Sequence, residues 1–215
     1  MGIPGSAPAQ VFHAVGDRVD HVDRRIIEVI AGHRRGWATQ IADATMFIGA
    51  TTVGLGALCM AAAVLIVVLR AYRAAIVAGV ALVLAMVAAG ALKSVFERPR
   101  PPTDLALATA AGYSFPSTQA TETSALAASL IVLLLVGPGW GPRLSTDLSL
   151  RTKAGLSLAL VAAVGLVGVC MVYLGAHWFT DVIAGWLLGT AIGVAVGLVG
   201  RRIALPSAKA GPSTA

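Results

Sequence analysis

The chain has 215 residues, of which 57% are hydrophobic and only 12% are charged. This composition, together with a positive mean hydropathy, excludes an ordinary soluble monomer and predicts a membrane protein. The net charge of +6 does not indicate a nucleic-acid partner, because only 6% of the residues are aromatic and the basic residues lie between long apolar runs.

The first part of the chain predicts an amphipathic helix. Residues 11–33 repeat valine and isoleucine with a helical period, while Asp, Glu and Arg fill the remaining positions too densely for a membrane span. We expect this helix to lie along the membrane interface. A short helix over residues 37–49 then leads into the first span.

Five stretches are apolar enough to cross ~30 Å of hydrocarbon, which takes roughly 17–25 helical residues. They are residues 51–69, 74–92, 117–136, 154–174 and 182–200. The expected fold is an all-α integral membrane bundle of about five transmembrane helices with an N-terminal interfacial helix. Residues 1–50 would form the tail, interfacial helix and lead-in, residues 51–200 the membrane domain, and residues 201–215 a flexible cytoplasmic tail.

Lysine and arginine collect in alternate connections of this bundle, which indicates its orientation. The basic residues of one set of connections are Arg70, Arg73, Arg143, Arg151, Lys153, Arg201, Arg202 and Lys209. The positive-inside bias makes that side cytoplasmic, so residues 93–115 and 175–181 share the outer side. We expect an integral protein of a bacterial inner membrane with these two loops on the extracytoplasmic face.

The last predicted span carries a glycine every four residues, at Gly185, Gly189, Gly193 and Gly197. This period lines one helical face with hydrogen atoms, so another backbone can approach closely. Packing within the chain accounts for the pattern, and a homo-oligomer formed through this glycine face is the alternative. The two cysteines lack the spacing of a disulfide framework or a zinc site.

Three outer segments hold polar residues that helix packing does not explain. In the first, Lys93, Arg98 and Arg100 stand among prolines that force an extended chain. Such cations either bind an anion or snorkel at the membrane boundary. In the second, Pro116 precedes Ser117 and Thr118 at a predicted helix start, which either holds a phosphate-like anion with free N–H groups or is an ordinary capped helix.

The third segment contains His177 and Asp181 near the junction of the last two spans. If the helix is continuous there, the two side chains lie one turn apart on one face. The carboxylate then accepts a hydrogen bond from one imidazole nitrogen and leaves the other as a nucleophile or base. The alternative is a histidine with a purely structural role.

Taken together, the three segments resemble the membrane type 2 phosphatidic acid phosphatase (PAP2) superfamily, which includes lipid phosphate phosphatases and undecaprenyl diphosphate phosphatases. Its patterns are K-x6-R-P, P-S-G-H and S-R-x5-H-x3-D, in that order. The first is intact as Lys93, Arg100 and Pro101, and the second is partial, as Pro116-Ser117-Thr118-Gln119. The third keeps His177 and Asp181 but has Cys170-Met171 in place of Ser-Arg. The resemblance covers roughly residues 51–200.

The resemblance implies a role for each matching residue. His177 would attack phosphorus and form a phosphohistidine, and Asp181 would orient it. The phosphoryl oxygens would be held by Lys93, Arg100, Ser117, Thr118 and backbone N–H groups. These groups would stabilise charge in the transition state, and no metal or cofactor is implied.

Two departures from the family pattern bear on activity. Gln119 stands where the family has a second histidine, and an amide cannot deliver the proton that such a general acid gives, which is typically worth ~10²–10⁴ in rate. Met171 stands where the family has an arginine, and a thioether cannot clamp a phosphate. Glu122, one turn after Gln119, is a candidate for supplying the missing proton, with helix packing as the alternative.

The leading interpretation is a membrane lipid phosphatase that acts on a polyprenyl or glycerolipid phosphate at the outer face. An isoprenoid diphosphate is the favoured substrate over phosphatidate, because a phosphate leaving group is less basic than an alkoxide and depends less on the missing acid. The alternative is a non-hydrolytic relative that binds or translocates a phosphorylated lipid. A purely structural membrane protein would explain the glycine face but not the three matching segments.

Overall fold

The computed structural model describes residues 7–50, 71–108, 110–136 and 148–204, and four single positions between residues 59 and 69. Within these ranges the chain forms helices and no strand. The helices are α1 (Ala7–Gly32), α2 (Gly36–Ala50), α4 (Tyr72–Phe96), α5 (Thr118–Val136), α6 (Leu150–Tyr173) and α7 (Phe179–Ala204).

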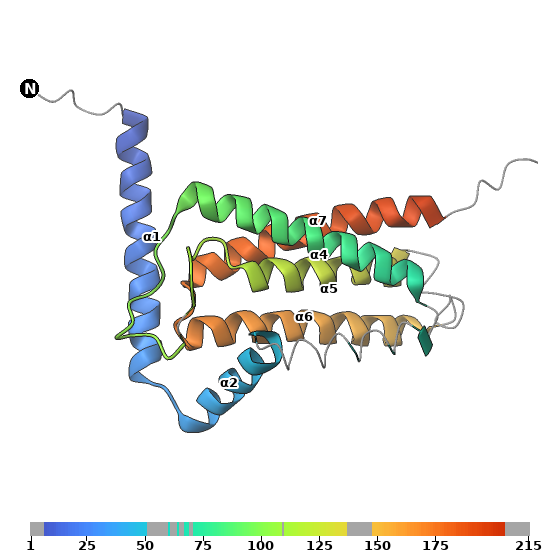
Figure 1. Ribbon diagram of the computed structural model, residues 1–215, viewed down its shortest axis with the longest axis horizontal. Helices are drawn as coiled ribbons and strands as arrows, with labels where there is room; N and C mark the ends of the chain where they lie inside the picture. The colour runs from blue at the N-terminus through green and yellow to red at the C-terminus, as the bar shows by residue number, and fades with distance from the viewer. Residues whose placement is uncertain are drawn as a thin grey trace, which may run out of the picture.

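Four of the helices, α4 to α7, are long and apolar enough to cross a membrane. They run side by side as one bundle (Figure 1), with many large apolar side chains on its outer surface. This confirms four of the five predicted spans and the all-α membrane fold. Except for those single positions, the predicted span at residues 51–69 lies outside the described residues. The last span runs on to Ala204, past the predicted end at residue 200.

Helix α5 lies at the centre of the bundle and contacts α4, α6 and α7. Small side chains make these contacts, among them Ala81 and Ala85 of α4 and Ala125 of α5, which have no exposed surface. Several hydroxyls of α5 donate to carbonyl oxygens of the turn before them. Ser124 Oγ, for example, donates to the Ala120 oxygen at 2.6 Å. Helices with small faces and satisfied hydroxyls can approach closely in a membrane.

The glycine face of α7 is buried against α5 of the same chain. A Cβ atom on Gly189 would overlap the Thr121 carbonyl oxygen, and one on Gly193 would overlap the Ala125 carbonyl oxygen. Both contacts are with backbone, so no side-chain rotation could relieve them. The glycine face is therefore not open to a second copy, and the homo-oligomer expected as an alternative through this face is wrong.

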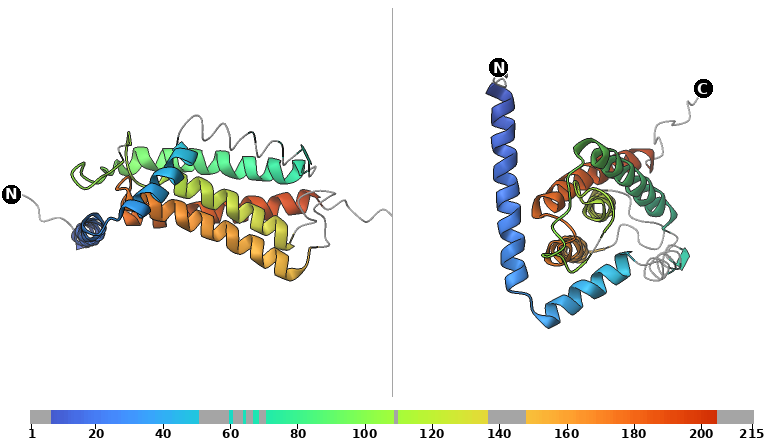
Figure 2. Two further views of the ribbon diagram at one scale, coloured as in Figure 1. Left: turned by 90° about the horizontal axis from the view of Figure 1, so that it is seen from below. Right: turned by 60° about the vertical axis from the view of Figure 1, so that its left-hand side comes forward.

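Helices α1 and α2 lie across one end of the bundle. Figure 1 and both views of Figure 2 show α1 crosswise to the spanning helices, as expected of a helix that lies along the membrane interface. Helix α1 contacts α6 and α7, and its Ile27 is buried. Helix α2 packs on α6, where Ala42 meets Cys170 and Leu174.

Candidate active site

The three polar segments singled out in the sequence meet at the end of the bundle that α1 crosses. Helices α4 and α6 end there, and helices α5 and α7 begin there (Figure 1). Lys93 lies in the last turn of α4, and Ser117 immediately precedes α5. The alternating direction of the helices thus brings together residues more than 80 positions apart in the sequence.

His177 lies in a turn between α6 and α7, within the loop expected at residues 175–181, so the condition of a continuous helix through this junction is not met. The chain reverses at Gly175, which has a φ of +73° and whose Cβ would stand 2.7 Å from the Ala106 Cα. Only glycine fits such a backbone position easily. The pair with Asp181 survives because Asp181, in the first turn of α7, accepts a hydrogen bond from the Trp178 N–H at 3.0 Å.

The His177 ring is placed between a carboxylate and a cation. Its Nδ1 atom stands 3.5 Å from Asp181 Oδ2, a loose pair, and its Nε2 atom stands 3.3 Å from Arg100 Nη1. A guanidinium can only donate, so Nε2 must be the nitrogen that carries the lone pair. The ring proton is then on Nδ1, facing Asp181, and the unprotonated nitrogen faces Arg100.

Burial lowers the pKa of His177 below its ordinary value, and the charges of Arg100 and Lys93 lower it further. The carboxylate of Asp181 acts in the opposite direction but does not reverse the shift. The imidazole is therefore neutral near pH 7, and only the neutral ring can act as a nucleophile.

Lys93 and Arg100 converge beside this ring. Both donate to the Tyr113 carbonyl oxygen, Lys93 Nζ at 2.6 Å and Arg100 Nη2 at 3.4 Å. Arg100 also donates to the carbonyl oxygens of Ala176, at 2.6 Å, and Gly112, at 3.0 Å. Burial lowers the pKa of Arg100 somewhat, yet a guanidinium keeps its charge in a protein. Arg100 thus contacts Nε2 of His177, and Lys93 shares the Tyr113 carbonyl oxygen with Arg100.

The start of α5 adjoins the start of α7. The Ser117 N–H donates to the Asp181 carbonyl oxygen at 3.0 Å, so this amide is not available for a phosphate. The Ser117 hydroxyl is buried and donates to Met171 Sδ at 3.6 Å. The amides of Thr118 and Gln119 belong to the first turn of α5, where N–H groups lack partners within the helix and favour an anion.

Gln119 and Glu122 are both half-buried on α5. In the described part of the chain, no hydrogen bond or ion pair joins either side chain to His177. A role for Glu122 as the proton donor therefore stays a prediction. Met171 is buried in the core with Ala120 and Val182, so the position of the family's arginine is apolar here.

The sequence missed Asp23 at this site, and it named Arg98 as a cation without its partners. Arg98 bridges Asp181 and Asp23 of α1. Nothing in the sequence separates Arg98 from the other cations. Asp23 could have been recognised from the sequence, because it stands one turn before Ile27 on the otherwise apolar face of α1. Among the described residues no three His, Cys, Asp or Glu side chains gather as metal ligands would.

Comparison with known proteins places this chain in a family. The model of the PAP2 superfamily matches residues 74–203. An undecaprenyl-diphosphatase of Sulfolobus acidocaldarius is 34% identical over 135 residues, which are 60% of this chain and 57% of that protein. The chain thus spans less than two thirds of the length of this relative.

Two solved structures share the fold at 22% sequence identity. A transmembrane PAP2-type phosphatidylglycerolphosphate phosphatase from Bacillus subtilis superposes with a TM-score of 0.71 over 86% of this chain and 88% of its own. LpxE of Aquifex aeolicus superposes with a TM-score of 0.56 over 83% of this chain and 93% of its own. At this identity the likeness concerns the arrangement of the helices.

Proposed function

The chain belongs to the PAP2 superfamily, and on this premise we propose that it is a membrane lipid phosphatase with His177 as its nucleophile. The observation that carries the proposal is the placement of the His177 ring, with Nε2 at 3.3 Å from Arg100 and Nδ1 toward Asp181. A receptor that only bound an anion would have no need of an imidazole oriented in this way.

The proposed reaction has two steps. In the first, the Nε2 lone pair of His177 attacks phosphorus, the P–N bond forms, and the bond from phosphorus to the leaving oxygen breaks. Asp181 stabilises the imidazolium, while Lys93, Arg100 and the first amides of α5 stabilise the phosphoryl oxygens. In the second, water attacks phosphorus, the P–N bond breaks, phosphate leaves and His177 returns to its neutral form.

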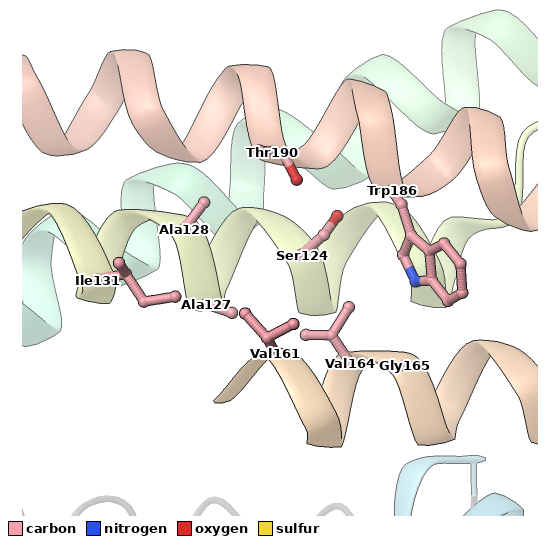
Figure 3. A pocket seen from close by; sticks show the side chains of 9 residues that line it. All are labelled: Ser124, Ala127, Ala128, Ile131, Val161, Val164, Gly165, Trp186 and Thr190. Carbon is pink, nitrogen blue, oxygen red and sulfur yellow. The ribbon is translucent and has the colours of Figure 1, made fainter. Parts of the chain in front are cut away.

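An apolar cavity supports a lipid as the substrate. It has a volume of about 300 Å³ and lies between α5, α6 and α7 (Figure 3), with Ser124, Val161 and Trp186 among its lining residues. Trp186 comes five residues after Asp181 along α7, and Ser124 comes seven after Ser117 along α5. At 1.5 Å per residue the cavity begins roughly 8–10 Å deeper in the membrane than the site. A lipid with its phosphate at His177 could place its first hydrocarbon segment there.

We expect purified protein to release phosphate faster from undecaprenyl diphosphate than from phosphatidic acid. With Gln119 in place of an acid, the leaving oxygen departs without a proton, and a phosphate tolerates this better than an alkoxide. The expected ratio of kcat/KM is at least about 10² in favour of the diphosphate. Phosphate release in detergent measures it, with His177→Ala as the background. Equal or faster turnover of phosphatidic acid would contradict the substrate preference.

We also propose that the site faces the extracytoplasmic side of a bacterial inner membrane. Arg73, Arg151 and Arg201 belong to the opposite end of the bundle, which the positive-inside bias makes cytoplasmic. A cysteine introduced at the exposed Leu107, beside the site, should react with a membrane-impermeant maleimide in intact spheroplasts, whereas one at Leu150 should react only after lysis. The reverse pattern would refute this orientation. Both labels are compared in a variant without Cys59 and Cys170.

A second candidate function is binding or translocation of a phosphorylated lipid without hydrolysis. It is favoured by Met171, which lies in the apolar core where the family has a phosphate-clamping arginine. One experiment, phosphate release, distinguishes the two functions. If neither the wild type nor Gln119→His releases phosphate from either lipid, the second function replaces the first.

A further inference from the structure

Helix α1 contributes one fully buried carboxylate to the outer end of the bundle. Asp23 has no exposed surface, whereas the neighbouring Asp20 has a side chain that is 70% exposed. A buried charge is costly unless it is paired and hydrogen-bonded, so the contacts of Asp23 show what holds it there.

Both oxygens of Asp23 are engaged. Oδ1 accepts a hydrogen bond from the Thr180 N–H at 3.0 Å, in the first turn of α7. Oδ2 accepts from Arg98 Nη2 at 2.8 Å and from the Thr180 hydroxyl. One carboxylate of α1 thus binds both the start of α7 and the guanidinium that follows α4.

Arg98 connects Asp23 with the candidate active site. Its other terminal nitrogen, Nη1, donates to Asp181 Oδ1 at 2.7 Å and to the Thr180 hydroxyl at 2.8 Å. Burial by itself would lower the pKa of Arg98, but the bonds to Asp23, Asp181 and Asp20 raise it above its ordinary value. The guanidinium stays charged between two buried carboxylates and lies 5.5 Å from the Trp178 ring centre.

These contacts fix the orientation of the Asp181 carboxylate. Oδ1 is bound by Arg98 and Oδ2 by the Trp178 N–H, and this leaves Oδ2 as the oxygen that faces His177 Nδ1. Asp181 cannot rotate about its terminal bond without losing both hydrogen bonds. This carboxylate is the charged group next to His177 Nδ1, at 3.5 Å.

We propose that Asp23 is a positioning residue for phosphoryl transfer, which acts through Arg98 to hold Asp181 against His177. The proposal rests on the function proposed above and deepens it, because it makes α1 a part of the catalytic unit as well as a helix at the membrane surface. Asp23 itself would touch neither the substrate nor the reacting atoms.

The physical effect on the reaction is electrostatic and geometric. Attack on phosphorus turns the neutral His177 ring into a cation, and Asp181 is the carboxylate that faces it. If Asp23 is made neutral, Asp181 becomes the only buried carboxylate that pairs with the positive charge of Arg98. The negative potential at His177 then weakens, and the carboxylate loses one of its two supports.

The test compares Asp23→Asn with Asp20→Asn. The two aspartates contact the same nitrogen of Arg98, Asp20 at 2.6 Å, but Asp20 is exposed, so it serves as the matched control. We expect Asp23→Asn to lower kcat on undecaprenyl diphosphate roughly 10- to 100-fold with KM little changed. Asp20→Asn should stay close to the wild type.

The pH profile separates positioning from a loss of folded protein. The charged groups that face His177 are Arg100, Lys93 and Asp181, and none of them changes in the variant. Removing the negative charge of Asp23 makes the imidazolium less stable, so the acid limb of kcat/KM should move to lower pH. A smaller folded fraction would reduce the rate at every pH and leave the limb in place.

A measurement without turnover distinguishes failure of this inference from failure of the proposed function. ¹⁵N spectra of histidine-labelled protein follow the titration of His177, which we expect to shift to lower pH in Asp23→Asn. If neither the wild type nor Gln119→His releases phosphate, the proposed function fails, and the titration still decides the positioning role. Unchanged kcat and unchanged His177 titration in Asp23→Asn would overturn the inference.

A second variant covers the case in which Asp23→Asn does not fold. Arg98→Lys keeps the charge, but a single ammonium cannot reproduce the fork that joins Asp23 to Asp181. The same fall in kcat and a displaced His177 titration are expected from it. Wild-type values for both in folded Arg98→Lys would equally refute the role assigned to the bridge.

Discussion

Replacement of His177 by alanine is expected to lower phosphate release from undecaprenyl diphosphate by at least about 10³-fold. Alanine removes the only protein atom that bonds to phosphorus in the proposed mechanism, while the cations Lys93 and Arg100 remain to bind the phosphate. The loss should therefore be in kcat, with lipid binding largely retained. Initial rates in detergent, corrected for the folded fraction, measure the change.

His21→Ala is the matched control, because His21 is an exposed histidine on α1 and lies outside the site. Its rate should equal that of the wild type. Rapid quenching at alkaline pH offers a second readout, since a P–N bond is stable there. Label from a ³²P substrate should remain on the wild type and be absent from His177→Ala. A variant that kept more than a tenth of the wild-type rate would rule out His177 as the nucleophile.

The membrane helices could be predicted closely because burial in lipid imposes a simple rule on the sequence. A span needs about 20 apolar residues, and the expected stretches 74–92 and 154–174 fall within or next to α4 and α6. The charge density of residues 11–33 predicted in the same way a helix outside the bundle, and α1 lies crosswise to the spanning helices. The glycine period of α7 predicted a close contact with another helix, but it did not indicate whether that helix was α5 or belonged to a second copy.

The site was only partly predictable, because sequence spacing fixes local pairs and says little about distant partners. His177 and Asp181 are neighbours although His177 lies in a turn before α7, because Asp181 in the first turn of α7 reaches back to the chain before it. Arg98 and Arg100 stand two positions apart and have different partners, since Arg98 binds Asp23 and Asp181 whereas Arg100 contacts His177. What separates them is a carboxylate 75 positions away, Asp23, which no local pattern connects with Arg98.

Gln119→His should raise the rate on phosphatidic acid by ~10²–10⁴, because it restores a group that can protonate a leaving alkoxide. The gain on undecaprenyl diphosphate should be clearly smaller, since a phosphate leaving group has less need of the proton. The ratio of kcat/KM between the two lipids would therefore shrink in this variant. Initial rates on both lipids, measured with the same preparation, test both statements.

Thr123→His is the matched control, because it places a histidine one turn deeper on the same helix, where the residue is also half-buried. It should leave both rates unchanged or lower. Glu122→Gln adds a further distinction. If Glu122 supplies the proton in the wild type, this change slows the wild type on phosphatidic acid and has little effect in the Gln119→His background, where the new imidazole supplies the proton. An equal gain on both lipids in Gln119→His would show that the added histidine improves binding, and the leaving-group explanation of substrate preference would fail.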